Sequence, residues 1–336
     1  MVKQKSGTKL FRYAVVGCGC IGEKRIKMLH PGQLAIACDV DPQKARSFIK
    51  RNGSGHITTN YKVAVADPAV DIVIVSTINC FLSKVTAAAI KSGKHVLVEK
   101  PAGIDSQEIK NLIRLAKKHK VYVRPGFNHR FHPAISKAHE IVSSGVLGPL
   151  MFICGRYGHG GRVGYHKEWR ANPKLSGGGE LIDQGVHLID LARWFLGDFK
   201  TVHGTTMTYF WKMPVEDNAF LQLQTKKGQI AWLHASCTEW KNMFSLEIYG
   251  REGKLQIDGL GGSYGLERLR YYKMLPQMGP PVTSEWKFSG NDDSWSKEIK
   301  VFEEDIRSRR EPTPNLSDAL EVMHCVETIY KRNGYR

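Results

Sequence analysis

The sequence predicts an α/β protein with an N-terminal doubly wound parallel sheet and a C-terminal α/β domain that contains a large, mostly antiparallel open sheet. Three observations support this prediction. The chain has 336 residues, which suits two domains of roughly 150 residues each. Its first half alternates short apolar runs with helical segments, as βαβ units do. Its second half contains long segments in which apolar and polar residues alternate, as in antiparallel strands.

The first half supplies strands and helices in strict alternation. The run DIVIVST is apolar throughout, which indicates a strand buried on both faces of a parallel sheet. Pro42 suits the first turn of a helix, and Asp105 suits an N-cap. We expect strands at residues 11–16, 34–39, 71–77, 95–100 and 121–126, and helices at residues 21–30, 42–50, 81–92 and 105–118.

The second half begins with one strong helix and continues with strands. The glycine-rich stretch 259–272 is predicted to be a loop between strands. The pattern changes near residues 124–130, so we assign residues 1–127 to the first domain and residues 128–336 to the second. The last helix belongs to the second domain in sequence but could pack back on the first. We expect helices at about 180–196, 295–308 and 316–331, and strands at 202–210, 218–225, 229–237, 244–250 and 254–258.

The composition points to a cytoplasmic protein that binds neither membranes nor metals. No apolar run approaches the roughly 20 residues of a membrane span, and MVKQKSGTKL lacks the apolar segment of a signal peptide. The seven cysteines contain no C-x-x-C pair, which favours free thiols over a disulfide framework or a zinc site.

Positive charge is concentrated in the first half. The net charge is +17, and residues 1–127 carry 22 Lys and Arg against 8 Asp and Glu. Such a surface could attract a dinucleotide, a sugar nucleotide or a nucleic acid, or it could be a solvated lysine-rich face. We expect no nucleic-acid partner, because no basic motif studded with aromatic residues is present.

The loop GCGCIG after the first strand has the spacing of a dinucleotide-binding turn. Gly17 would make the tight turn, Gly19 would let the backbone approach a pyrophosphate, and Gly22 would let the next helix pack on the strand. Asp39 ends the second strand, where a carboxylate can accept both ribose hydroxyls of NAD and repel a 2′-phosphate. NAD is therefore the predicted cofactor, and NADP remains an alternative because Arg46 is nearby in the sequence.

Two stretches carry candidate catalytic residues. Lys100 in VLVEKPAG ends a parallel strand, at the edge where open α/β sheets bind ligands, although it could equally be a surface charge. Asp183 and His187 are four residues apart on one predicted helix and would share a face. Such a pair can orient an imidazole for proton transfer, or it can be an ion pair on a helix surface.

The ordered combination of GCGCIG, EKP, NHRFHP and GGGELIDQGVHLIDLARWFLG resembles the Gfo/Idh/MocA oxidoreductase family, which includes glucose–fructose oxidoreductase and inositol dehydrogenases. The resemblance spans essentially the whole chain. It implies a Rossmann domain followed by a domain whose open sheet forms contacts in a homodimer or homotetramer. It also implies that Lys100 polarises the reacting oxygen, that His187 is the catalytic acid or base, and that Asp183 is the carboxylate beside it.

One stretch departs from the family pattern. The family often has T-P-N-x-x-H after the third strand, whereas Ile78 and Leu82 occupy the Pro and His positions here. We expect Thr77 and Asn79 to preserve cofactor binding. The predicted cofactor site comprises Gly17, Gly19, Cys20, Ile21, Gly22, Asp39, Thr77, Asn79, Glu99 and Lys100.

Substrate contacts are predicted on both sides of the glycine run. Asn128 and Arg130 follow the last strand of the first domain and could face the cleft. Tyr165, Trp169 and Arg170 precede the glycine run and could line a pocket, and arginine suits a carboxylate or phosphate. Each of these residues could instead have a packing or surface role. Asp183 and His187 complete the predicted substrate site.

The predicted function is that of an NAD(P)-dependent dehydrogenase or ketoreductase acting on a secondary alcohol of a sugar, cyclitol or nucleotide sugar. Hydride transfer from an alcohol leaves a proton that a histidine can accept, and the nicotinamide takes the hydride. Two alternatives remain: an NAD-dependent glycosidase of the same fold, and a non-catalytic NAD-sensing regulator. A sensor would need none of Lys100, Asp183 and His187.

Overall fold

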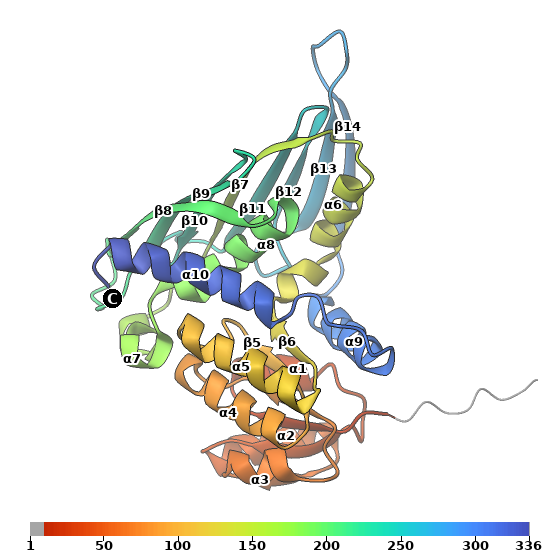
Figure 1. The fold of residues 1–336 in the computed structure, drawn as a ribbon, viewed down its shortest axis with the longest axis vertical. Helices are drawn as coiled ribbons and strands as arrows, with labels where there is room; N and C mark the ends of the chain where they lie inside the picture. The colour runs from red at the N-terminus through yellow and green to blue at the C-terminus, as the bar shows by residue number, and fades with distance from the viewer. Residues whose placement is uncertain (1–9, 336) are drawn as a thin grey trace, which may run out of the picture.

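The computed structural model describes residues 10–335 and contains two sheets (Figure 1). The first sheet has six parallel strands in the order β3-β2-β1-β4-β5-β6. The second has eight strands in the order β14-β13-β12-β11-β7-β10-β9-β8, and only the β7–β10 pair is parallel. The predicted fold class is therefore confirmed.

The first sheet and its helices follow the predicted alternation, with a short extra strand and helix between the second and third predicted strands. The elements are β1 (Tyr13–Val16), α1 (Cys20–Ile26), β2 (Leu34–Cys38), α2 (Pro42–Asn52), β3 (His56–Thr58), α3 (Tyr61–Ala66), β4 (Ile72–Val75), α4 (Asn79–Lys91), β5 (His95–Glu99), α5 (Ser106–His119) and β6 (Val123–Gly126).

Helices α6, α8 and α10 cover one face of the second sheet, and alternate side chains of its central strands are buried (Figure 1). Its elements are α6 (Pro133–Ser143), β7 (Leu150–Gly158), α7 (Pro173–Ser176), α8 (Val186–Leu196), β8 (Phe199–Met207), β9 (Asn218–Thr225), β10 (Ile230–Ser236), β11 (Met243–Gly250), β12 (Gly253–Asp258), β13 (Glu267–Lys273), β14 (Val282–Phe288), α9 (Ser294–Arg307) and α10 (Leu316–Arg332).

The prediction of a loop over residues 259–272 was wrong for its second part, where β13 begins at Glu267. Leu269 is fully buried and pairs with Ile257 of β12, while its neighbours Arg268 and Arg270 are half-buried. Arginines flank the apolar position on both sides. Burial of every second residue is nevertheless enough to hold a strand against an existing sheet.

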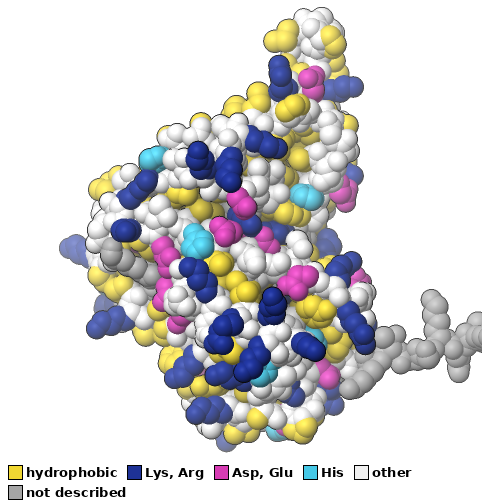
Figure 2. All heavy atoms as spheres, viewed as in Figure 1, with side chains coloured by type: hydrophobic (Ala, Val, Ile, Leu, Met, Phe, Trp, Pro, Cys, Tyr) yellow, Lys and Arg dark blue, Asp and Glu magenta, His cyan; other side chains and the backbone are white. Residues whose placement is uncertain are grey.

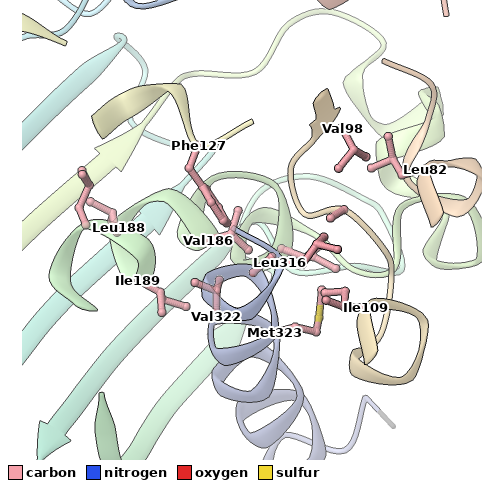
Figure 3. Packing of buried hydrophobic residues seen from close by; sticks show 14 of the residues in the cluster. Leu82, Val98, Ile109, Phe127, Val186, Leu188, Ile189, Leu316, Val322 and Met323 are labelled. Carbon is pink, nitrogen blue, oxygen red and sulfur yellow. The ribbon is translucent and has the colours of Figure 1, made fainter. Parts of the chain in front are cut away.

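The last helix joins the two halves of the molecule. Helix α10 packs against α5 of the first half and against α8 and β8 of the second. Figure 3 shows Met323 of this helix beside Ile109, and Val322 beside Ile189. These residues belong to one continuous apolar cluster that extends from the first sheet to the second.

Helix α9 also returns to the first half, where a buried ion pair holds it. The guanidinium of Arg25 in α1 is fully buried and pairs with Glu298 of α9. Its Nε also donates to Glu99 at the end of β5, at 2.8 Å. The ring of Trp295 covers the same guanidinium, with 4.4 Å between Cζ and the ring centroid.

Lys and Arg side chains are frequent on the surface of the first half, in the lower part of the view in Figure 2. Of the helices within residues 10–335, none is both long and apolar enough to cross a membrane.

Candidate active site

The glycine loop between β1 and α1 has the geometry of a dinucleotide cradle. Gly17 has φ +98°, and a Cβ there would lie 2.4 Å from the carbonyl oxygen of Ser76, so no side chain fits. At Gly19, in contrast, a Cβ would meet nothing within 4 Å. The backbone is thus bare on its outer side, as close approach of a pyrophosphate requires.

Asp39 is fixed beside this loop. Its Oδ2 accepts from the backbone N–H of Cys18 at 2.7 Å, and its Oδ1 accepts from that of Asp41 at 2.9 Å. Each oxygen keeps a further lone pair for a ribose hydroxyl. The bare loop and this oriented carboxylate together fit the ribose and pyrophosphate of NAD.

A cavity of about 380 Å³ opens beside the loop, between the carboxyl edge of the first sheet and the second sheet. Residues of both halves line it. The predicted residues among them are Ile21, Thr77, Asn79, Glu99, Lys100, Asn128, Tyr165, Trp169, Arg170, Asp183 and His187.

Other predicted residues do not line this cavity. Gly17, Gly19, Cys20, Gly22 and Asp39 belong to the glycine loop and its flank.

Arg130 is turned away into the second half, where its Nε and Nη2 donate to Asp190 at 2.8 and 2.6 Å. A buried guanidinium needs a carboxylate partner, and the nearest one lies on α8. Arg130 therefore holds α8 against the turn after β6, and its expected place at the substrate has no support.

The departure from the family pattern after β4 leaves the cavity intact. Thr77 and Asn79 both line it, and the Nδ2 of Asn79 donates to the carbonyl of Ser176 at 2.8 Å. Leu82 is fully buried in the apolar cluster, near Val98 (Figure 3). The residue at this position therefore contributes to packing.

Lys100, Asp183 and Arg170 form a chain of charges on the cavity wall. The Nζ of Lys100 donates to Oδ1 of Asp183 at 2.6 Å and also to its backbone carbonyl. The Nε of Arg170 donates to the other carboxylate oxygen at 3.1 Å. Burial raises the pKa of Asp183, but the two cations outweigh this effect and hold the pKa well below its usual range. The carboxylate is therefore ionised and fixes the ammonium of Lys100.

Asp183 and His187 face the same cavity, as expected from their spacing, but the backbone around Asp183 is not the expected α-helix. Residues 181–185 form a π-helical turn before α8 begins at Val186. In such a turn the backbone hydrogen bonds join residues five apart, and the two side chains still face the same cavity. Among residues 10–335, the carboxylate of Asp183 accepts from Lys100 and Arg170 and makes no hydrogen bond to the imidazole of His187, so it is placed to act on the lysine.

His187 lies at the base of the cavity with 5% of its surface exposed. Its ring stacks on that of His129, with centroids 3.8 Å apart, and meets Phe127 edge-on at 6.0 Å. Its Nδ1 has no hydrogen-bond partner among residues 10–335. Burial, followed by the charge of Lys100, lowers its pKa well below the ordinary value of 6.5. The imidazole is therefore neutral at neutral pH and able to accept a proton.

Sequence reasoning missed more than half of the cavity wall. Some signal was present: His129 and His132 lie within NHRFHP, and Asp292 and Trp295 lie within and beside the acidic segment before α9. Lys24 lies in α1, Tyr157 in β7 and Gln184 in the turn before α8, and most of the others come from loops with no local motif. The missed residues are Lys24, Ser76, His129, His132, Tyr157, His159, Gly161, Arg162, Gln184, Asn242, Leu260, Ser263, Tyr264, Asp292 and Trp295.

Two family models match the sequence. The model described as "Oxidoreductase family, NAD-binding Rossmann fold" matches residues 11–127, and the "GFO/IDH/MocA C-terminal domain" model matches residues 135–256. The chain belongs to the GFO/IDH/MocA oxidoreductase family. The resemblance seen in the motifs is thereby confirmed, as is NAD as the cofactor of this oxidoreductase.

Curated relatives in the GFO/IDH/MocA family are distant but extend along the chain. D-glucoside 3-dehydrogenase of Escherichia coli is 26% identical over 352 residues, covering 95% of this chain and 94% of that protein. Myo-inositol 2-dehydrogenase of Thermotoga maritima is 24% identical over 329 residues and 91% of each chain. Levoglucosan dehydrogenase of Pseudarthrobacter phenanthrenivorans is 26% identical over 195 residues, which cover 57% of this chain and 50% of that one.

Solved structures share the whole fold. A levoglucosan dehydrogenase in complex with NADH and L-sorbose has a TM-score of 0.85 at 20% identity and covers 97% of both chains. The aldose-aldose oxidoreductase of Caulobacter crescentus, complexed with glycerol, has a TM-score of 0.85 at 25% identity, covering 97% of this chain and 98% of that one.

Proposed function

We propose that this chain catalyses reversible hydride transfer between NAD and a secondary alcohol of a sugar or cyclitol. The observation that carries the proposal is the pairing of Lys100 with Asp183 in the same cavity wall as the neutral imidazole of His187. A sensor would have no use for this arrangement. The names of the relatives, which include dehydrogenases of a glucoside, an inositol and levoglucosan, support a polyhydroxylated substrate.

The residues of the cavity divide the chemistry as follows. The glycine loop, Asp39 and the Thr77–Asn79 turn would hold NAD, whose nicotinamide would supply the hydride acceptor. His187 accepts the proton of the reacting hydroxyl, because its neutral form persists at neutral pH. Lys100 donates a hydrogen bond to the same oxygen and stabilises the negative charge that develops there. Asp183 keeps the ammonium in place.

The wall opposite the cofactor loop favours an uncharged substrate over a nucleotide sugar. Arg162 and Arg170 are the cations there, and both are already paired: Arg162 with Glu168 at 2.6 Å, and Arg170 with Asp183 at 3.1 Å. A phosphate would have to displace these carboxylates. Hydroxyl groups, in contrast, suit the four histidines of the cavity, His129, His132, His159 and His187.

The test is NADH formation, followed by absorbance at 340 nm, with a panel of free sugars, cyclitols, methyl glycosides, nitrophenyl glycosides and UDP-sugars. We expect turnover with at least one uncharged sugar or cyclitol. Turnover of UDP-sugars and of no other compound would contradict the proposal. Release of a chromogenic aglycone without net NADH would instead identify a glycosidase. NAD binding without turnover across the whole panel would identify a sensor.

The outer face of the second sheet supports association with a second copy of the chain. Trp232 of β10 is 58% exposed, and Phe220 and Phe152 lie on the neighbouring strands β9 and β7. Phe152 stacks on Tyr249 of β11 at 4.2 Å. Exposed aromatic side chains in a row across a sheet are typical of an interface. Light scattering should give the mass of a dimer or tetramer, and Trp232→Glu should reduce it to one chain.

A further inference from the structure

Three large aromatic side chains gather where the cavity meets the surface. They are Phe210 and Trp211 in the β8–β9 connection and Trp240 in the β10–β11 connection, and we call them the mouth cluster. The ring of Phe210 meets Trp211 edge-on at 5.1 Å and Trp240 edge-on at 4.6 Å. Phe210 is 54% exposed and Trp240 is 66% exposed. Exposed apolar groups of this size mark binding surfaces.

The mouth cluster is continuous with the cavity wall. Trp211 contacts Tyr165, with ring centroids 5.5 Å apart, and Tyr165 lines the cavity. Gly161 also lines the cavity, and a Cβ on it would lie 2.4 Å from Cζ2 of Trp211. Asn242, two residues after Trp240, lines the cavity as well. The cluster therefore begins where the wall of the cavity ends.

The cluster is held rigidly although it is exposed. Asp217 is fully buried, and its carboxylate accepts from three consecutive backbone N–H groups, those of Tyr209, Phe210 and Trp211, at 2.8 to 2.9 Å. The indole Nε1 of Trp211 donates to the carbonyl of Cys237 at 2.9 Å, which links the two connections. Trp240 has φ +56°, a conformation that costs a bulky residue free energy. Rigid aromatic rings lose little entropy when they bind a ligand.

We propose that Phe210 and Trp240 form a second subsite, outside the cavity, for an apolar group attached through a glycosidic bond to the ring that reacts. The substrate would then be a glycoside and not a free sugar. The inference rests on the proposed function, and it deepens it. The cavity wall is polar and suits the hydroxyls of the reacting ring, whereas the mouth offers aromatic faces. A phenyl group or the apolar face of a second sugar ring can stack on such faces.

The test compares binding of phenyl and methyl glycosides to the NADH-loaded enzyme by isothermal titration calorimetry, with glucosides, galactosides and mannosides as probes. We expect at least one phenyl glycoside to bind about tenfold more tightly than its methyl counterpart. Trp240→Ala and Phe210→Ala should reduce this ratio to about two or less and leave the Kd of the methyl glycoside unchanged. Val63→Ala is the control, an exposed apolar side chain on α3 of the first half, and should leave the ratio unchanged.

Several results would overturn the inference. These are the absence of any phenyl preference, a preference that survives in both mouth variants, and failure of every glycoside to bind. Loss of oligomer mass in Trp240→Ala, measured by light scattering, would show that the cluster contacts a second chain instead. The proposed function fails separately, if the ratio behaves as expected but no glycoside yields NADH.

Discussion

The Nζ atom of Lys100 lies 2.6 Å from Oδ1 of Asp183, although 83 positions separate the two residues in the sequence. One stands at the end of the first sheet and the other in the π-helical turn that precedes α8. Their contact joins the two halves of the molecule in the wall of the cavity. The second half of the chain thus sets the position of the Lys100 ammonium.

Replacing Lys100 by alanine should reduce turnover roughly a hundredfold, since the developing charge on the substrate oxygen loses its partner. The Kd of NADH, measured by fluorescence titration, should change less than twofold, because Asp39 and the glycine loop are untouched. Lys91→Ala, at the exposed end of α4, is the control and should retain full activity. Unchanged turnover in Lys100→Ala would contradict the assigned role.

The rate of alcohol oxidation should not fall on the acidic side of neutrality, so the acid limb of its pH profile should lie well below pH 7. The base must be unprotonated, and burial together with Lys100 lowers the pKa of His187 well below 6.5. As pH falls from 8 to 6.5, kcat/KM should therefore stay level and decline only in more acidic solution. In Lys100→Ala the limb should move to higher pH, because one cause of the lowered pKa is gone. A wild-type limb centred at or above 6.5 would be incompatible with this picture.

Cofactor selectivity should depend on Asp39 and not on its neighbour Asp41. Asp39→Ala removes the acceptor of the ribose hydroxyls and the charge that repels a 2′-phosphate, so NAD should bind about tenfold more weakly while NADP binding improves. Asp41→Ala deletes only the cap of α2, where its Oδ1 accepts from Gln43 N–H. In Asp41→Ala the ratio of the Kd of NAD to the Kd of NADP should therefore be unchanged. An unchanged ratio in Asp39→Ala would remove that residue from the cofactor site.

Glu180 should make the protein less stable in alkaline solution. It is buried beside the cavity, and its Oε1 accepts from the hydroxyl of Tyr165 at 2.8 Å. Burial, and then the charge of Asp183, raises its pKa to about 8. Between the ordinary value of 4.5 and about 8, the folded state holds a proton that the unfolded state has lost, so stability falls as pH rises through this range and levels off above it.

Glu180→Gln should remove this dependence. The amide keeps an oxygen for Tyr165 but carries no titrating proton. Between pH 6 and 9, the Tm of the wild type should fall by about 5 °C more than that of the variant, which corresponds to roughly 2–3 kcal/mol. Glu304→Gln, at an exposed position on α9, serves as the control. Parallel Tm curves for wild type and Glu180→Gln would show that Glu180 is already ionised at pH 6.

The sequence was sufficient for those parts of the fold and site that depend on local pattern. Lys100 follows an apolar strand at a known edge of the sheet, so its place in the cavity could be predicted. Arg130 could not be placed, because its partner Asp190 lies 60 positions away. The orientation of the Asp183 side chain could not be predicted either, because it depends on a π-helical turn that the residue pattern does not indicate. Long-range pairing and turn geometry are properties of the folded chain and leave no periodic signal.

The pairing of Arg25 with Glu298 has a consequence for how this chain can be dissected and recombined. A fragment cut after residue 127 would keep Arg25 and Arg124 but lose the carboxylates of Glu298 and Asp305 that neutralise them. In chimaeras that graft a relative's C-terminal half onto this nucleotide-binding half, Arg25 keeps Glu99 as a partner, but the graft must bring an acid to position 305 or leave the buried guanidinium of Arg124 without a carboxylate, at the cost of several kcal/mol. The two halves therefore cannot be exchanged independently between relatives, because each must carry the partner of the other's buried charges.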